Sequence, residues 1–97
     1  MDVLVTYDVS TETSAGRRRL RQVAKACEGY GQRVQKSVFE CALTEVQFER
    51  LVQRLVGLIE PAEDSLRVYR LVEPRERYVQ TYGIDRRIDL EKGTLVV

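Results

Sequence analysis

The sequence of 97 residues contains no histidine and only two cysteines. The lack of histidine removes the commonest metal ligand and the commonest general base. Cys27 and Cys41 do not have the paired C-x-x-C spacing of a zinc site, so we interpret both as reduced thiols of a core. Ser37 has no histidine to activate it, which argues against a serine nucleophile. These absences disfavour zinc sites and histidine-dependent catalysis.

Long apolar runs are absent as well, and none approaches the length of a membrane span. The N-terminus carries Asp2 where a secretory signal would need basic residues, so we expect a cytoplasmic protein without membrane association. Hydrophobic residues make up 43% of the chain and charged residues 32%, which is typical of a globular protein. The length suits one domain with one modest core.

Charge is nearly balanced in number but not in position. The formal net charge is +1, yet Glu28 is the single acid between residues 14 and 36. That segment holds the basic residues Arg17, Arg18, Arg19, Arg21, Lys25, Arg33 and Lys36. Because a phosphate backbone responds to where charge lies, the sequence predicts a basic face.

Hydrophobic periodicity changes several times along the chain. Residues 3–9 alternate as a β-branched strand, and residues 15–27 follow helical spacing after a possible cap at Thr13 or Ser14. Residues 34–43 are extended, as two short strands or one bent strand. Thr44 and Gln47 match a capping box before a helix that reaches Ile59, and residues 65–72 alternate again. This order predicts an α+β fold, a ferredoxin-like βαββαβ sandwich with both helices on one face.

The other face of such a sheet would stay uncovered, although Leu4 and other apolar residues lie on it. We therefore expect a homodimer. Residues 78–82, beyond the Glu73-Pro74 break, are strand-like and could extend the sheet of the partner subunit. The predicted organisation is a ferredoxin-like domain at residues 1–72 and a dimer-associated C-terminal strand and tail at residues 73–97.

Asp8 ends the first predicted strand and is followed by a polar loop, where a carboxylate either caps a helix or binds a cation. Capping is the commoner role of such a residue. One carboxylate does not hold magnesium well, but a two-fold axis near the strand end would bring two Asp8 side chains together. The Asp8 hypothesis therefore requires the dimer.

The first predicted helix carries a basic stripe. With Leu20, Val23 and Cys27 turned inward, Arg18, Arg21 and Lys25 lie on the solvent side at helical spacing. Such a stripe suits phosphate groups, although solvated basic faces are also frequent in proteins that bind no nucleic acid. The scarcity of acids in the segment favours nucleic acid.

Four stretches together resemble the Cas-two family of CRISPR-associated proteins: Val5-Thr6-Tyr7-Asp8-Val9, the arginine-rich helix, the segment from Gly31 to Glu40, and Asp64-Ser65-Leu66-Arg67-Val68-Tyr69. The resemblance covers about three-quarters of the chain in order. It implies a ferredoxin-like homodimer that joins the Cas-one integrase and helps to capture spacer DNA. It also implies a magnesium-dependent nuclease acting on RNA or DNA. Asp8 falls on the family's metal-binding aspartate, and Arg17, Arg18, Arg33 and Phe39 match its motif.

These observations lead to one functional hypothesis and two alternatives. The first is a CRISPR adaptation protein with Mg²⁺-dependent endonuclease activity, in which Asp8 is the metal ligand and catalytic residue. Nucleic acid would bind at Arg17, Arg18, Arg21, Lys25 and Arg33. The alternatives are a noncatalytic scaffold that clamps duplex DNA in the integrase complex, and a ferredoxin-like small-molecule sensor. The loop after Asp8 lacks the further aspartate of many relatives, so each chain offers one strong candidate ligand.

Overall fold

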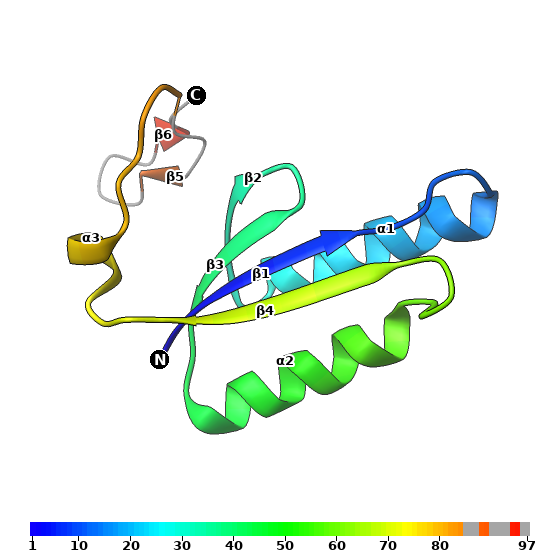
Figure 1. Cartoon of the computed structure of the whole chain (residues 1–97), viewed down its shortest axis with the longest axis horizontal. Coiled ribbons are helices and arrows are strands. Elements are labelled where there is room, and N and C mark those ends of the chain that lie inside the picture. The colour runs from blue at the N-terminus through cyan, green and yellow to red at the C-terminus, as the bar shows by residue number, and fades with distance from the viewer. Residues whose placement is uncertain (85–87, 90–93, 96–97) are drawn as a thin grey trace.

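The computed structural model describes residues 1–84, 88–89 and 94–95. Four strands form one antiparallel sheet: β1 (Asp2–Asp8), β2 (Gly31–Gln35), β3 (Val38–Ala42) and β4 (Ser65–Leu71). Their order in the sheet is β2-β3-β1-β4. The helices α1 (Ser14–Glu28) and α2 (Glu45–Leu58) lie on the same side of this sheet (Figure 1). The predicted α+β, ferredoxin-like βαββαβ fold is confirmed.

The alternation of β1 separates the two faces of the sheet. Val3, Val5 and Tyr7 are buried against the helices, together with Phe39 of β3 and Leu55 of α2. Leu4 and Thr6 lie on the opposite, uncovered face, because successive side chains of a strand point to opposite sides. The alternation predicted for residues 3–9 is therefore confirmed.

Both long helices begin at the side-chain caps that the sequence predicts. The Thr13 hydroxyl accepts a hydrogen bond from the Gly16 N–H at 3.0 Å. Thr44 and Gln47 form a reciprocal capping box at the start of α2, with the Thr44 N–H donating to Gln47 Oε1 at 3.0 Å. Each cap satisfies backbone donors that a helix start leaves without partners inside the helix.

The extended segment at residues 34–43 is two strands of a hairpin. β2 pairs antiparallel with β3, and their register shifts between Arg33 and Gln35. A turn at Lys36 and Ser37 separates the strands, and the Ser37 carbonyl accepts a hydrogen bond from the Tyr7 N–H at 3.1 Å. The two-strand alternative of the sequence analysis is the one the fold adopts.

The start of the strand predicted at residues 78–82 is corrected, because Tyr78 lies in a helix, while pairing of the later residues with a partner subunit is not tested within one chain. Tyr78 instead ends a short helix, α3 (Arg75–Tyr78), and the following residues up to Ile84 form neither helix nor strand. Pro74 is the N-cap residue that precedes the helix. Arg75 also anchors the turn, since its Nε lies 3.4 Å from the Glu40 carboxylate of β3.

Beyond Ile84 the described part of the chain contains one further pairing. The short strands β5 (Ile88–Asp89) and β6 (Thr94–Leu95) pair antiparallel with each other. Pairing of the C-terminal segment with a second subunit stays a prediction, as do the boundaries at residues 1–72 and 73–97, and part of that tail lies outside the described residues. No helix within the described residues has both the length and the apolarity that a membrane span requires.

Candidate metal site and nucleic-acid interface

Asp8 is the last residue of β1 and lies opposite Ser65 of β4 in the antiparallel register. Its side chain is exposed. Strand alternation places it with Leu4 and Thr6 on the face of the sheet that the helices leave uncovered. Across the described part of the chain, no basic side chain forms an ion pair with Asp8. The carboxylate is therefore accessible to a cation.

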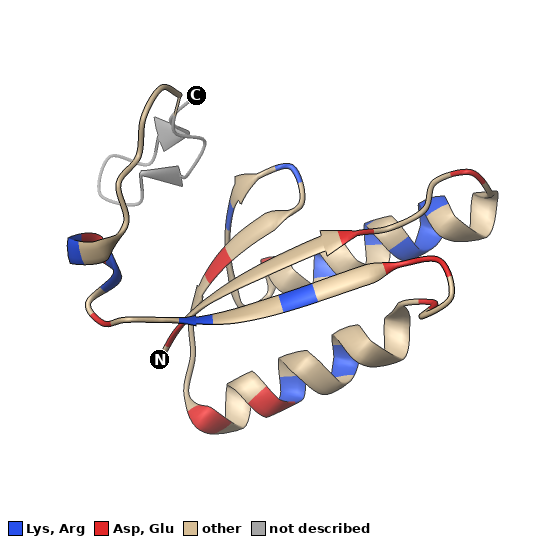
Figure 2. Ribbon diagram, in the orientation of Figure 1, with Lys and Arg blue, Asp and Glu red and all other residues tan. Residues whose placement is uncertain are grey.

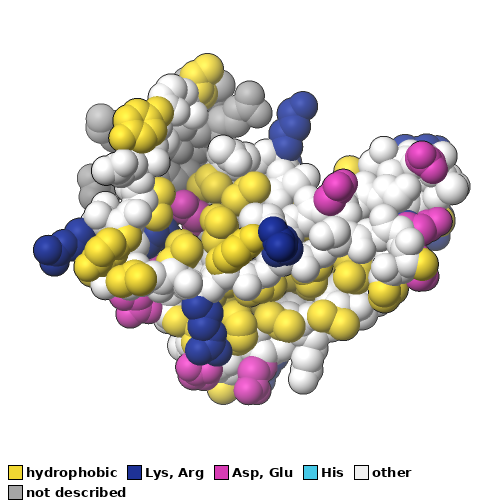
Figure 3. Space-filling model, viewed as in Figure 1, with side chains coloured by type: hydrophobic (Ala, Val, Ile, Leu, Met, Phe, Trp, Pro, Cys, Tyr) yellow, Lys and Arg dark blue, Asp and Glu magenta, His cyan; other side chains and the backbone are white. Residues whose placement is uncertain are grey.

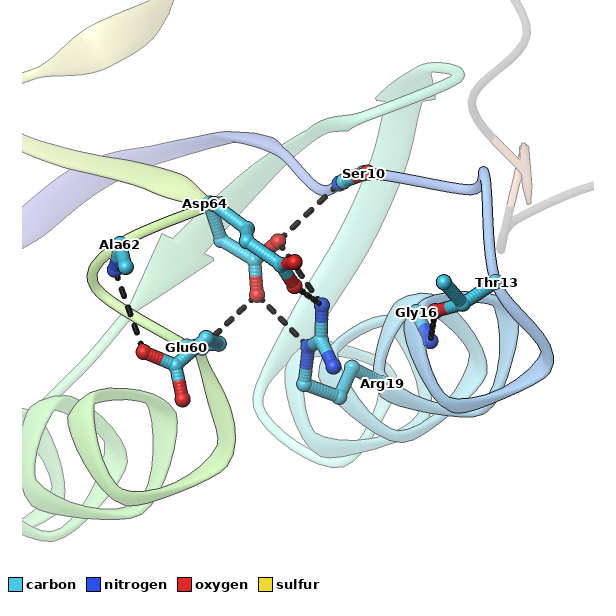
Figure 4. A network of polar contacts seen from close by, with 8 residues as sticks. Ser10, Thr13, Gly16, Arg19, Glu60, Ala62 and Asp64 are labelled. Carbon is cyan, nitrogen blue, oxygen red and sulfur yellow. Dashed lines mark hydrogen bonds and ion pairs between the residues drawn. The ribbon is translucent and has the colours of Figure 1, made fainter.

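The loop that follows Asp8 is held by a second aspartate, Asp64 (Figure 4). Asp64 Oδ1 accepts a hydrogen bond from the Ser10 N–H at 3.0 Å, and Oδ2 accepts one from the Glu60 N–H at 2.8 Å. Arg19 Nε donates to Oδ2 at 2.8 Å. The Arg19 guanidinium, followed by these backbone donors, holds the pKa of Asp64 below its usual range against the opposing effect of burial. Asp64 is thus a charged, fully engaged side chain.

The donors of one chain do not form a complete metal cage. Within the residues that the structure describes, no three histidine, cysteine, aspartate or glutamate side chains are grouped so that they could hold a metal ion. Asp64 does not fill the gap, since its oxygens already accept hydrogen bonds from Arg19, Ser10 and Glu60. An exposed carboxylate is a suitable magnesium ligand, but Mg²⁺ requires further oxygen donors. Asp8 therefore fits a metal site only where a second molecule contributes to it.

The predicted basic stripe is present on α1. Arg18, Arg21 and Lys25 are all exposed, while Val23 and Cys27 of the same helix are fully buried. Figure 2 shows the basic residues distributed along the helix. Among the described residues none of the three makes an ion pair. Their charge is therefore available to a phosphate backbone.

The stripe and Asp8 do not share a surface within one chain. The buried residues of α1 face the sheet, so the stripe points away from it, whereas Asp8 lies on the uncovered side of the sheet. Arg17 is nearest to Asp8 in sequence, and its Nη1 donates to the Thr11 carbonyl oxygen at 3.0 Å. Arg17 thus contributes to the shape of the loop that follows Asp8.

Arg33 is engaged with its own chain. Its guanidinium lies 5.2 Å from the centre of the Phe39 ring and 3.6 Å from the Glu28 carboxylate. The Tyr7 ring stacks on the same Phe39 ring, with the two ring centres 6.3 Å apart. Burial raises the pKa of Tyr7, while the nearby Arg33 acts in the opposite direction. This cluster packs β1, β2 and β3 together on the helix side.

Two basic residues outside the predicted set have defined positions near Asp8. Arg67 of β4 lies opposite Thr6 on the uncovered face, with its guanidinium 5.9 Å from the centre of the Tyr69 ring. The alternation of residues 65–72 already places Arg67 and Tyr69 on one side. The second residue is Arg19. Its helical spacing from the buried residues Val23 and Ala26 places it on the inward side of α1, which is the sequence feature that could have identified it. Sequence reasoning selected neither.

The uncovered face of the sheet is hydrophobic as well as basic. Hydrophobic side chains gather over the sheet in Figure 3, with charged groups rising among them. On this face Leu4 and Val38 are half-buried, and Tyr69 is 43% exposed. Two long helices cover only the opposite side. An apolar sheet face of this kind is typical of a protein interface.

Comparison with known proteins gives a consistent result. The family described as "CRISPR associated protein Cas2" matches residues 1–79. The chain is 57% identical over 91 residues to "CRISPR-associated endoribonuclease Cas2 1" of Moorella thermoacetica, covering 94% of this chain and 95% of the relative. It is 50% identical over 91 residues to "CRISPR-associated endonuclease Cas2" of Halalkalibacterium halodurans, with coverage of 94% and 95%.

A solved structure agrees with these sequence relatives. The crystal structure titled Streptococcus pyogenes Cas2 at pH 6.5 superposes with a TM-score of 0.77 and is 55% identical. The match covers 86% of this chain and 100% of that one. Sequence pattern, identity and fold thus agree over most of the described residues, and the chain belongs to the family of CRISPR associated proteins Cas2.

Proposed function

We propose that this protein is a CRISPR-associated endonuclease that hydrolyses phosphodiester bonds of RNA or DNA in the cytoplasm. The observation that carries the proposal is the exposed Asp8 carboxylate at the end of β1, which no described basic residue neutralises. Relatives that are half or more identical to this chain carry the names endoribonuclease and endonuclease. The exposed basic stripe on α1 supports binding of a phosphate backbone.

The proposed active form is a homodimer that holds Mg²⁺ between two Asp8 side chains. Within the described residues no cluster of acidic side chains completes a metal site around Asp8, so a symmetry-related copy would supply a second Asp8 carboxylate. The hydrophobic uncovered face with Leu4, Val38 and Tyr69 supports such an association. A bound magnesium ion would activate water and offset charge on the phosphate. Asp8 would bind the ion, and the cations of α1 would hold the polynucleotide.

The test compares wild type with Asp8→Asn on labelled single-stranded RNA and duplex DNA, with Mg²⁺ or with a chelator. We expect wild-type cleavage that disappears in the chelator and in Asp8→Asn. Glu12→Gln is the matched control, because Glu12 is an exposed acid four residues further along the chain. Its cleavage should equal that of wild type. Cleavage by Asp8→Asn at the wild-type rate would refute the assignment, and sedimentation of wild type as a monomer would refute the shared site.

A noncatalytic role in spacer acquisition is the second candidate. The structure separates the α1 stripe from Asp8, so DNA can be bound without contact with the carboxylate. A scaffold that clamps DNA beside the Cas-one integrase would need the stripe and not the metal. Spacer integration with purified integrase should then survive Asp8→Ala and fail when Arg18 and Arg21 are both replaced by glutamate. Absence of salt-sensitive nucleic-acid binding would instead favour the small-molecule sensor.

A further inference from the structure

The backbone of Ser10, two residues beyond Asp8, is held from two sides. Its N–H donates to Asp64 Oδ1 at 3.0 Å. Its carbonyl oxygen lies against Gly16 of α1, where a β-carbon would overlap it. Only glycine permits this approach, because every other residue adds a side-chain carbon there. The segment that follows β1 is therefore held by the Asp64 carboxylate on one side and by close contact with Gly16, which has no side chain, on the other.

Asp64 is also tied to the strand neighbour of Asp8. Ser65, the next residue in sequence, is the β4 residue that lies opposite Asp8 in the sheet. The same carboxylate thus anchors the segment that follows Asp8 and the segment that pairs with it. The side chain of Asp64 has an exposed fraction of 0%, and it draws Arg19 of α1 and the Glu60 N–H onto one oxygen (Figure 4).

The two acidic partners of Arg19 differ in environment. Arg19 Nη2 also lies 2.8 Å from Glu63 Oε2, but the Glu63 side chain is 49% exposed. A solvated ion pair contributes little, whereas removing one partner of a buried pair leaves a charge without compensation. The chain therefore contains its own control, since Glu63 binds the same arginine, whereas the Ser10 N–H donates to Asp64.

We propose that the Arg19–Asp64 ion pair, with the close approach at Gly16, is a positioning device that orients Asp8 for metal binding. This inference rests on the proposed function, because it assumes that Asp8 is the metal ligand. In this role Asp64 and Arg19 act through the loop, since both are engaged with each other and Asp64 also with backbone N–H groups. They hold the two backbone segments that border Asp8, as groups around a metal site hold its ligands, a role typically worth roughly 10- to 100-fold in metal affinity.

The experiment measures the orientation of the loop and metal affinity separately from catalysis. Hydrogen exchange of the Ser10 amide is followed in metal-free wild type and Asp64→Asn. Mg²⁺ is then titrated while the amide NMR signals around Asp8 are recorded. We expect faster exchange at Ser10 and a Mg²⁺ midpoint raised about 10-fold in Asp64→Asn. Glu63→Gln should match wild type in both readouts. Arg19→Lys keeps the positive charge and should fold. It replaces Asp64→Asn in both measurements if Asp64→Asn does not fold.

Cleavage rates measured on the same samples distinguish the possible outcomes. Positioning predicts that high Mg²⁺ restores cleavage by Asp64→Asn but not by Asp8→Asn. If the Mg²⁺ midpoint of Asp64→Asn equals that of wild type and its activity only follows the folded fraction, the positioning inference is overturned. The proposed nuclease activity is not affected by that outcome. If the wild type binds Mg²⁺ near Asp8 and Asp64→Asn shifts that binding, but the wild type never cleaves, the nuclease proposal is overturned and positioning is supported. A wild type with neither response would overturn both.

Discussion

Replacement of Asp64 by asparagine should destabilise the protein, although Asp64 lies outside the proposed catalytic site. The carboxylate is fully buried and accepts hydrogen bonds from the Ser10 and Glu60 N–H groups and from Arg19. Hydrogen bonds to charged groups contribute about 1.5–3 kcal/mol each, and an amide oxygen preserves part of the set. We therefore expect the free energy of unfolding to fall by about 2 kcal/mol at pH 7.

Thermal and urea unfolding followed by circular dichroism measures this change. A loss of that size lowers the midpoint temperature by roughly 8–16 °C for a domain of this length. All samples need the same protein concentration, because association with a second copy raises apparent stability by mass action. Glu63→Gln is the control, and it should unfold within about 0.5 kcal/mol of wild type because the Glu63 side chain is largely solvated.

The pH dependence provides an independent check of the same interaction. Folding lowers the pKa of Asp64 below the value of about 3.9 of a free aspartate. The charged carboxylate therefore stabilises the fold fully above that unfolded value, and the contribution is lost as pH falls through the lower folded value. The difference between wild type and Asp64→Asn should be constant from neutral pH down to about pH 5 and shrink below about pH 4. A difference no larger than that of Glu63→Gln at pH 7 would refute the reasoning.

Three further predictions concern other parts of the chain. Gly16→Ala should destabilise by about 1–3 kcal/mol in urea unfolding despite the better helix propensity of alanine, because the new β-carbon overlaps a loop carbonyl; a stabilised variant would contradict this. Burial raises the pKa of Cys27 to about 12 and that of Cys41 to about 11, so a thiolate-directed reagent at pH 8 should label only unfolded protein; rapid labelling of native protein would show otherwise. Arg21→Glu should lower the salt slope of nucleic-acid binding by about 1 or more, and Arg54→Glu on α2 should not; equal slopes would remove the stripe from the interface.

Local patterns of the sequence were sufficient for the secondary structure around the site. The alternation of residues 3–9 placed Asp8 at a strand end, and Thr13 and Thr44 marked the two helix starts. These features depend on near neighbours in the chain, through strand alternation and through caps that bond a few residues ahead. The family resemblance rests on the same motif-bearing segments, and the comparisons confirmed it.

Residues 75–78 show where local reasoning failed. Residues 78–82 were interpreted as strand-like, but Tyr78 ends a helical turn after Pro74. That turn is held by Arg75 through the Glu40 carboxylate and by a hydrogen bond from the Arg75 N–H to Asp2 Oδ2 at 3.2 Å. Both partners lie more than 30 residues away in sequence, so no local pattern could reveal them.

By itself, the sequence determined the alternation of strands and helices up to residue 72, the helix caps and the position of Asp8 at a strand end, because each depends on periodicity or on bonds between near neighbours. Only the tertiary structure decided which charges are free and which are engaged. It buried Asp64 under Arg19 across 45 positions of sequence, and left Arg18, Arg21 and Lys25 exposed on the same helix. Whether an arginine of this helix is paired or free depends on the segments that fold against it. The contact between Arg19 and Asp64 forms only once the sheet has brought their distant segments together.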